Sequence, residues 1–510
     1  MEQKVIDPVV LKALRQFKAL DEKITHFSSI IGLADWDQKV MAPKKGRSTF
    51  AKATGTLRTE IFKLSVSEEM GELLAELTLP DNLVLLDEVT RAKVREYKEF
   101  YQKSKSIPTD LFQEYSILTA QANDAWEEAR ENNDFGRFLP YLEKIVDYKR
   151  KFADIYGYED HPYDALLDEF EPGLTVKKLD PLFAKLRDSS VKLLERIQQN
   201  GKRTQAEIFE QSFSIEKQKE FNRYILPIIG FDLEAGRLDE TVHPFAQTVN
   251  TGDVRLTTRY LEGNVRSAIF GTIHEAGHGI YEQHINPQFE ESVLQSGASF
   301  GIHESQSRFL ENMVGRSKEF WKYFYPKIQE YFPKQLENIT VDEFYRAVNT
   351  VQPSFIRVEA DELTYNLHIM LRYEIEKALI SGEIEAKNLP EVWNQKMEDY
   401  LGVTPSTDTV GVLQDVHWSF GGIGYFPSYS LGNLYAAQIL RTIQKELPDF
   451  YNHIENGRFD LIQEWLKEKI HQYGKLYTPN ELIAKVTGEE LNAEYLVEYL
   501  EKKYTEVYGL

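Results

Sequence analysis

The sequence contains no cysteine among its 510 residues. Disulfide bonds, a thiol nucleophile and any cysteine-bound zinc or iron–sulfur site are therefore excluded. A transition metal in this protein would have to be held by histidine and carboxylate side chains. The absence of cysteine also fits a reducing compartment. We expect a cytoplasmic location, because the first residues lack the basic-then-apolar order of a secretory signal.

Long apolar runs and long basic runs are also missing. No stretch is apolar enough over about 20 residues to cross a bilayer, so we expect no membrane partner. The net charge is −21 without a long basic stripe, which argues against a sequence-independent grip on nucleic acid. Two interpretations of the acidic charge stay open: it keeps a large protein in solution, or it forms an acidic groove that attracts cationic substrates.

Proline is sparse, and most of the chain has a helical pattern. Apolar residues recur three and four positions apart between charged ones, as in amphipathic helices. No linker, charge block or clear repeat divides the chain, so we predict one mainly α-helical domain, residues 1–510, with two lobes around a cleft. The predicted helices are Leu11–Ile31, Leu83–Tyr101, Ile117–Asn132, Val176–Gln199, Asp342–Thr350 and Leu363–Ile380.

One segment has the character of strands instead. Phe245–Val249 and Asp253–Tyr260 contain β-branched residues and alternate in polarity, and Asn250-Thr251-Gly252 between them is a turn sequence. We therefore predict a β-hairpin immediately before the helix described next. A strand beside an active site can pair with an extended peptide through its free backbone groups.

Residues 274–278 read His-Glu-Ala-Gly-His within Val265–Ile285, which carries an apolar stripe at helical spacing. His274 and His278 are four residues apart, so their imidazoles project from one helix face and suit two ligands of one Zn²⁺. Glu275 is rotated about 100° from His274. From there it can act on a metal-bound water as a general base without binding the metal. The alternative is a helix with two solvated or core histidines.

A catalytic zinc needs a third protein ligand and one open position. No third histidine follows closely after His278. Downstream, His303–Glu311 has the pattern of a second amphipathic helix, and Glu304 lies 26 residues after His278. If this helix packs against the first, its carboxylate completes a His-His-Glu site. Alternatively, Glu304 only pairs with Arg308 four residues later, but the motif upstream favours the ligand.

In these motifs the sequence resembles the carboxypeptidase Taq family of zinc metallocarboxypeptidases, and the resemblance runs along most of the chain. The zinc motif is specific by itself, whereas the other segments gain weight from their joint presence in order. Those segments are Trp36-Asp37-Gln38 with Met41-Ala42-Pro43, His243-Pro244-Phe245, Asp253–Thr257, His303-Glu304-Ser305, Ile356–Asp361 and Gly411–Trp418.

The resemblance implies a mostly α-helical fold with a deep substrate groove and a small antiparallel sheet beside the metal. It also implies a zinc enzyme that releases single C-terminal residues from peptides with broad specificity, and a homodimer. The sequence does not decide whether Co²⁺ can replace Zn²⁺. More distantly, the layout is similar to the helical gluzincin peptidases, so an endo-acting oligopeptidase or peptidyl-dipeptidase is the alternative. A third hypothesis is a helical scaffold with a vestigial metal site, and the presence of Glu275 argues against it.

The tetrahedral oxyanion of peptide hydrolysis needs hydrogen-bond donors besides the metal. Related helical gluzincins supply a histidine and a tyrosine from a late segment rich in glycine and tyrosine, which residues 417–429 resemble. We predict that His417 and Tyr429 fill these roles, with Tyr425 as the next candidate. For the two tyrosines, ordinary packing is an equal alternative.

A carboxypeptidase must also recognise a free carboxylate, and arginine does so through a charged bidentate fork. Arg357 is the first candidate, with an internal salt bridge to Glu359 or Asp361 as the alternative. Arg255 on the predicted hairpin is the second candidate, and a structural role fits it equally well.

Three further residues are candidates for the substrate site. His243 precedes the hairpin and is expected either to contact substrate or to cap the turn. Gln414 and Asp415 are predicted to orient His417 or a ligand imidazole, a task that metal sites usually require.

Overall fold

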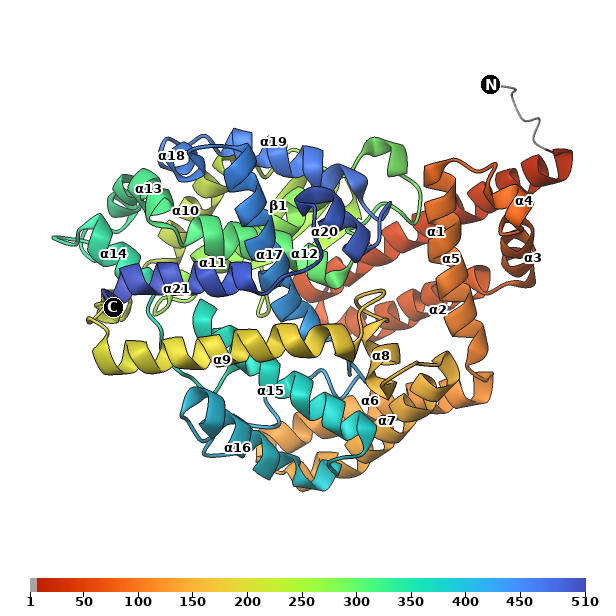
Figure 1. Ribbon diagram of the computed structural model, residues 1–510, viewed down its shortest axis with the longest axis horizontal. Coiled ribbons are helices and arrows are strands. Elements are labelled where there is room, and N and C mark those ends of the chain that lie inside the picture. The colour runs from red at the N-terminus through yellow and green to blue at the C-terminus, as the bar shows by residue number, and fades with distance from the viewer. Residues whose placement is uncertain (1–6) are drawn as a thin grey trace.

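The first part of the chain, up to Asn200, consists of helices, most of them long, joined by short connections (Figure 1). The computed structural model describes residues 7–510, so most of the N-terminal segment inspected for a secretory signal lies outside the described part. The helices of this part are α1 (Pro8–Val40), α2 (Arg47–Ser65), α3 (Glu68–Leu77), α4 (Pro80–Leu83), α5 (Glu88–Ser106), α6 (Thr109–Asn132), α7 (Phe135–Tyr156), α8 (Pro162–Leu167) and α9 (Val176–Asn200).

The middle of the chain holds the three strands and the helices that follow them. These elements are α10 (Ile215–Ile228), β1 (Gly236–Glu240), β2 (Ala246–Asn250), β3 (Asp253–Thr258), α11 (Val265–Gln283), α12 (Phe300–Arg308), the π-helix η4 (Phe309–Gly315), α13 (Lys318–Tyr331) and α14 (Val341–Val348). The last part contains α15 (Glu362–Ser381), α16 (Leu389–Leu401), α17 (Pro427–Glu446), α18 (Phe450–Glu455), α19 (Phe459–Lys469), α20 (Pro479–Thr487) and α21 (Glu494–Tyr508). The predicted mainly α-helical class is confirmed.

Helix boundaries follow capping residues more than the apolar pattern. The helix expected from Leu83 is interrupted, because the Asp87 side chain accepts the Thr90 N–H and begins α5 there. The helix expected from Ile117 begins earlier, at Thr109, directly after Pro108. The apolar stripe located both helices, but it did not place their first turns.

The predicted hairpin is confirmed as β2 and β3, which pair antiparallel. The sheet as a whole is mixed and not antiparallel, because β1 adds on the other side of β3 in the parallel direction. The sequence Gly236–Glu240 has a single large apolar residue, Leu238, so it lacks the alternation from which a strand can be predicted.

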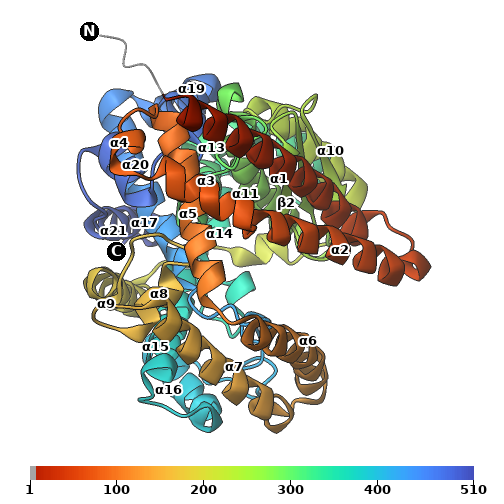
Figure 2. The ribbon, with the colours of Figure 1, turned by 90° about the vertical axis from the view of Figure 1, so that its right-hand side faces the viewer.

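The sheet lies between α11 and α1. Val254 and Leu256 are buried on the face toward α11, whereas the alternate residue Arg255 points to the opposite face. There the Trp36 ring of α1 lies 4.5 Å from the Arg255 guanidinium and 4.9 Å from that of Arg237. Figure 2 shows α1 crossing in front of β2. The tryptophan segment of the sequence therefore attaches α1 to the sheet.

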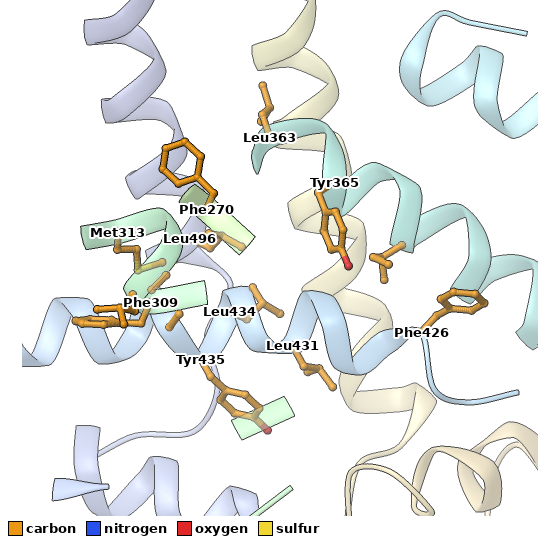
Figure 3. Close-up of a cluster of buried hydrophobic side chains, with 14 of the residues drawn as sticks. Phe270, Phe309, Met313, Leu363, Tyr365, Phe426, Leu431, Leu434, Tyr435 and Leu496 are labelled. Atoms are coloured by element: carbon orange, nitrogen blue, oxygen red, sulfur yellow. The ribbon is translucent and has the colours of Figure 1, made fainter. Parts of the chain in front are cut away.

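The apolar core forms one large cluster that extends from Leu118 to Tyr508, and α1, α3 and α5 contribute a separate, smaller cluster. Helix α17 runs through the large cluster, and Figure 3 shows Leu431, Leu434 and Tyr435 on this helix among side chains from several others. The tightest helix packing brings α12 between α11 and α17. A Cβ on Gly277 of α11 would lie 2.5 Å from the Ser307 Cα, so only glycine permits this approach.

Candidate metal centre and substrate-binding residues

Helices α11 and α12 bring the three predicted metal ligands together. The Nε2 atoms of His274 and His278 lie 3.7 and 3.4 Å from the Oε2 atom of Glu304. One donor atom from each of the three residues falls within 4.8 Å of the others. Two imidazoles and a carboxylate with this spacing form the donor set of a catalytic zinc site, so these residues fit a divalent metal ion.

Both histidine rings are held from behind by other side chains. His274 Nδ1 is hydrogen-bonded to Glu311 Oε2 at 3.0 Å. His278 Nδ1 is hydrogen-bonded to His303 Nδ1 at 2.6 Å, and His303 Nε2 in turn to Glu282 Oε1 at 2.7 Å. Because both Nδ1 atoms are engaged, the Nε2 atoms are left to face Glu304. This is the outer-shell arrangement that orients metal-bound imidazoles.

Glu311 reaches His274 from a π-helix, which directly follows α12. All seven residues of this segment are buried. The wider π turn changes the direction of side chains relative to α12, and such turns are frequent at functional sites. The sequence analysis missed Glu311. Its only signal was a carboxylate within the apolar run Phe309–Val314.

Arg308 links the metal site to its surroundings and was also missed as a functional residue. Its Nε donates to Glu304 Oε1 at 2.7 Å, its Nη1 lies 3.4 Å from Glu311 Oε2, and its guanidinium lies 4.3 Å from the centre of the Tyr365 ring. The proposed pairing of Glu304 with Arg308 therefore exists, but it leaves Glu304 Oε2 directed at the histidines. Burial acts to raise the pKa of Glu304, yet Arg308 and His274 lower it overall.

The site favours a neutral His278 and an ionisable Glu275. Burial lowers the pKa of His278 to about 3, so this ring is neutral, which is the form in which an imidazole can bind a metal. Burial raises the pKa of Glu275 to about 7. The Glu275 carboxylate forms no hydrogen bond with any residue of the described range 7–510. It is therefore free to exchange a proton with a bound molecule.

His417 and Tyr429 lie together, as their joint assignment requires. His417 Nε2 is 3.2 Å from the Tyr429 hydroxyl, and the Tyr425 ring lies 5.4 Å from the His417 ring and 5.3 Å from that of Tyr429. The negative charge of Glu304 contributes to raising the pKa of both tyrosines, although burial is the larger cause. The two tyrosines are therefore close enough to the metal ligands to be influenced by them.

A buried carboxylate holds this segment in place. Glu376 of α15 accepts hydrogen bonds from Trp418 Nε1 at 2.8 Å, the Gly424 N–H at 2.9 Å and the Tyr163 hydroxyl at 2.6 Å. It thereby joins both ends of the loop between His417 and Tyr425. Sequence reasoning missed this residue, because it is one glutamate within an ordinary amphipathic helix.

Arg357 is buried and pairs with a residue that the sequence analysis assigned elsewhere. Its Nε and Nη2 donate to Asp415 Oδ1 at 3.1 and 2.8 Å, and its Nη1 donates to the Tyr365 hydroxyl at 3.0 Å. Arg372 donates to the other oxygen, Asp415 Oδ2, at 2.7 Å. The alternative salt bridges of Arg357 to Glu359 or Asp361 are absent. Two guanidinium groups share one carboxylate, which leaves an excess positive charge.

Gln414 and Asp415 both form hydrogen bonds with Arg357. Gln414 Oε1 accepts the backbone N–H of Arg357 at 2.9 Å. Asp415 Oδ1 lies 4.0 Å from His417 Nδ1, beyond hydrogen-bonding range. The structure thus places both residues around Arg357, whereas the sequence analysis placed them around His417 or a ligand imidazole.

Arg255 and His243 lie apart from this group. Arg255 forms a bidentate pair with Asp253 at 2.8 and 2.7 Å on the sheet face opposite α11, which supports its structural interpretation. His243 is exposed on the loop before β2 and forms no side-chain hydrogen bond within residues 7–510. The expectation that it caps the turn therefore has no support in the geometry.

Comparison with known proteins identifies the family of this chain. The sequence profile of carboxypeptidase Taq (M32) metallopeptidases matches residues 16–504. The chain belongs to this family. It is 49% identical to carboxypeptidase 1 of Bacillus subtilis over 97% of this chain and 99% of that protein. It is 40% identical to thermostable carboxypeptidase 1 of Thermus thermophilus over 98% and 99%.

A solved structure extends the agreement to the fold. The M32 carboxypeptidase of Deinococcus radiodurans superimposes with a TM-score of 0.93 and 34% identity, covering 98% of this chain and all of that one. The protein is therefore a metallocarboxypeptidase, and the resemblance found in the sequence is confirmed. The hypothesis of a scaffold without activity is set aside. No helix in residues 7–510 of this metallocarboxypeptidase is long and apolar enough to span a membrane.

The position of Glu304 depends on a glycine in α17. A Cβ on Gly432 would lie 2.4 Å from Glu304 Cγ and 2.8 Å from Glu304 Cβ. We expect Gly432→Ala to displace this carboxylate and to weaken metal binding by about tenfold or more, as for other changes that disturb ligand orientation. Competition with a chromogenic chelator measures the affinity. Gly55→Ala is the matched control, since nothing lies within 4 Å of that position; equal affinities for the two variants would contradict the expectation.

Glu376 gives the folded state a specific pH dependence. Burial raises its pKa from 4.5 to about 7, so the folded protein binds this proton more tightly than the unfolded chain. The resulting stabilisation is complete below pH 4.5 and is lost as the pH rises through about 7. Glu376→Gln loses a hydrogen-bond acceptor but does not titrate. Its deficit in melting temperature relative to wild type should therefore narrow between about pH 5 and pH 8. A deficit that is constant, like that of the exposed control Glu385→Gln, would contradict this assignment.

Proposed function

We propose that this metallocarboxypeptidase holds a single Zn²⁺ at His274, His278 and Glu304 and removes one residue at a time from the C-terminus of peptides, with broad specificity. The observation that supports this most strongly is the convergence of three donor atoms within 4.8 Å beside an uncommitted carboxylate, Glu275. When bound, the ion would polarise the scissile carbonyl and lower the pKa of a water molecule. Co²⁺ can take similar ligands, so its substitution for Zn²⁺ belongs to the same proposal.

Proton transfer falls to Glu275 in this proposal. Its carboxylate accepts the proton of the attacking water and then delivers it to the nitrogen of the leaving amine. Burial raises its pKa to about 7, which is suited to both directions of transfer. Neither oxygen of Glu275 is committed to a neighbouring residue, which supports this role over that of a fourth ligand.

His417 and Tyr429 are proposed to stabilise the oxyanion. Burial lowers the pKa of His417 to about 3, so the ring is neutral and can donate one N–H. The Tyr429 hydroxyl lies 3.2 Å from His417 Nε2, so the two groups can share one acceptor. Tyr425 stands next to both and is the alternative donor.

Arg357 is proposed to receive the free carboxylate of the substrate. Asp415 and Tyr365 fix the plane of its guanidinium, and at least one N–H on each terminal nitrogen remains available. The excess positive charge of Arg357 and Arg372 over Asp415 favours an anion at this point. Gln414 supports the loop, whereas Arg255 and His243 are retained only as residues that border the sheet.

Assembly and location complete the proposal. We infer a homodimer of a single domain with two lobes around a substrate groove, as the resemblance implies, and a cytoplasmic protein. The absence of cysteine supports a reducing compartment. The continuous apolar cluster from Leu118 to Tyr508 supports a single domain.

The decisive experiment follows a short unmodified peptide by mass spectrometry, with and without a chelator. We expect stepwise loss of one residue from the C-terminus, abolished by the chelator and restored by Zn²⁺. The same peptide with a C-terminal amide should be resistant, because Arg357 then has no carboxylate to bind. Cleavage of the amide at internal bonds would instead favour the oligopeptidase alternative.

Substitution of Glu275 separates proton transfer from metal binding. We expect Glu275→Gln to lower kcat by about 10²- to 10⁴-fold, the usual contribution of a general base, while the bound metal remains stoichiometric. Elemental analysis and steady-state kinetics on the same preparation measure the two effects. Loss of metal in this variant would mean that Glu275 is a ligand and would contradict its assignment.

A further inference from the structure

A strongly basic segment projects from this acidic protein. Residues 39–63, here called the basic arm, contain seven lysine or arginine residues and one glutamate, so their net charge is +6 while the whole chain carries −21. Sequence analysis missed the segment because the cations are spread over two helices and their connection rather than forming a run. The seven cationic residues are Lys39, Lys44, Lys45, Arg47, Lys52, Arg58 and Lys63, and all are exposed.

Most of this charge is unneutralised. Arg58 pairs with Asp35, and Lys63 pairs with Glu60. The other five cations form no ion pair with any residue of the described range 7–510. Helix α2 buries only Thr54 and Ser65, and its larger apolar side chains are half-buried against neighbouring helices, whereas all of its lysine and arginine residues are exposed.

Helix α6 carries the opposite charge and is here called the acidic arm. Its residues 109–132 include six aspartate or glutamate residues and one arginine, a net charge of −5. The two arms meet at one end, where the rings of Phe62 and Phe112 stack at 5.9 Å and Phe100 of α5 lies 6.5 Å from Phe62. Figure 2 shows α2 and α6 both extending from α5 toward the same side of the molecule.

The metal centre and the residues around His417 are attached to different arms. On the acidic arm, Trp126 Nε1 donates to the Leu413 carbonyl at 3.1 Å, and Asn123 Oδ1 accepts the Ser419 hydroxyl at 3.2 Å. These contacts place α6 against the segment that carries His417. The acidic arm therefore supports the side of the site that is proposed to bind the oxyanion.

The basic arm supports the metal side. The Lys39 ammonium lies 4.5 Å from the centre of the Phe245 ring. The neighbouring Pro244 is 4.0 Å from the Cβ position of Gly271, which is three residues before His274 on α11. Taken together, these contacts put Lys39 on the order of 15 Å from the metal ligands, or about four to five extended residues. The basic arm thus contacts the loop beside α11, which carries the metal motif, and the acidic arm contacts the segment that carries His417.

We propose that the basic arm selects peptide substrates with acidic side chains several residues upstream of the scissile bond. This rests on the proposed carboxypeptidase function, in which the C-terminal carboxylate is held at Arg357 and the upstream residues lead away from the metal. At such distances exposed charges interact only at low to moderate salt, where the Debye length is about 8–10 Å. The arm therefore acts mainly on the rate of productive encounter, and its effect appears in kcat/KM.

A peptide fits this arrangement better than a long polyanion. A nucleic acid laid along the basic arm would also meet the acidic arm, where six carboxylates repel phosphate. An isolated acidic cluster in a peptide can face α2 while the rest of the chain remains neutral near α6. An acidic surface that attracts cationic substrates therefore describes only the acidic arm, whereas the basic arm attracts anionic side chains.

The test compares two peptides with identical last two residues and either four glutamates or four glutamines before them. We expect wild-type kcat/KM to be higher for the glutamate peptide by about threefold or more at low salt, and the ratio to approach one at about 0.5 M salt. In the variant Lys44→Glu, Lys45→Glu, Lys52→Glu the ratio should fall below one. Circular dichroism and melting temperature check that this variant is folded.

The matched control carries the same charge change elsewhere, as Lys192→Glu, Lys202→Glu, Lys502→Glu at exposed positions in α9, just after the end of α9 and in α21, respectively. It should keep the wild-type ratio. A ratio near one for wild type, or equal ratios for the two triple variants, would overturn the inference while leaving the carboxypeptidase function intact. Failure to cleave either peptide would instead count against the proposed function. Binding of duplex DNA by wild type with a peptide ratio of one would assign the arm to nucleic acid.

Discussion

The Nε2 atoms of His274 and His278 face one carboxylate because their Nδ1 atoms are already bound on the opposite side. Glu311 holds one ring and His303 holds the other. Without these partners each imidazole could rotate or change tautomer, and the donor atoms would not converge. The rest of the site depends on this constraint. If both imidazoles and Glu304 supply the donor atoms, Glu275 is left outside the ligand set and can serve as a base.

Close packing of three helices makes this constraint possible. Helix α12 lies between α11 and α17, and the approach at Gly277 and Gly432 leaves no room for a side chain on either neighbour. A glycine within a helix costs about 1 kcal/mol relative to alanine. That cost is offset by contacts that hold Ser307 of α12 directly against α11 and Glu304 of α12 directly against α17. Burial also strengthens the charge interactions at the site, where Arg308 offsets the negative charge of the Glu304 and Glu311 carboxylates beside it.

A second buried network shapes the substrate side. Arg357 and Arg372 share Asp415, and Glu376 joins Trp418 to Gly424. Two cations around one anion leave a charge that a substrate carboxylate can neutralise. The same protein exposes separated arms of opposite sign at its surface, so its overall charge of −21 describes neither region.

The sequence by itself determined the helical class, the hairpin and the metal motif. These follow from local rules: residues four apart share a helix face, and alternating strands joined by a turn that contains asparagine and glycine form a hairpin. Glu304 could be chosen because a catalytic site needs a third ligand and a suitable carboxylate followed.

Only the tertiary structure decided the roles of Glu311, Arg308 and Glu376, the pairing of Arg357 with Asp415, and the parallel addition of β1. Each of these depends on contacts between segments that are distant in sequence or on a turn, such as the π-helix, that changes side-chain direction. Periodicity reports which side of an element is buried. It carries no information about which partner lies there, because that is set by the packing of the whole chain.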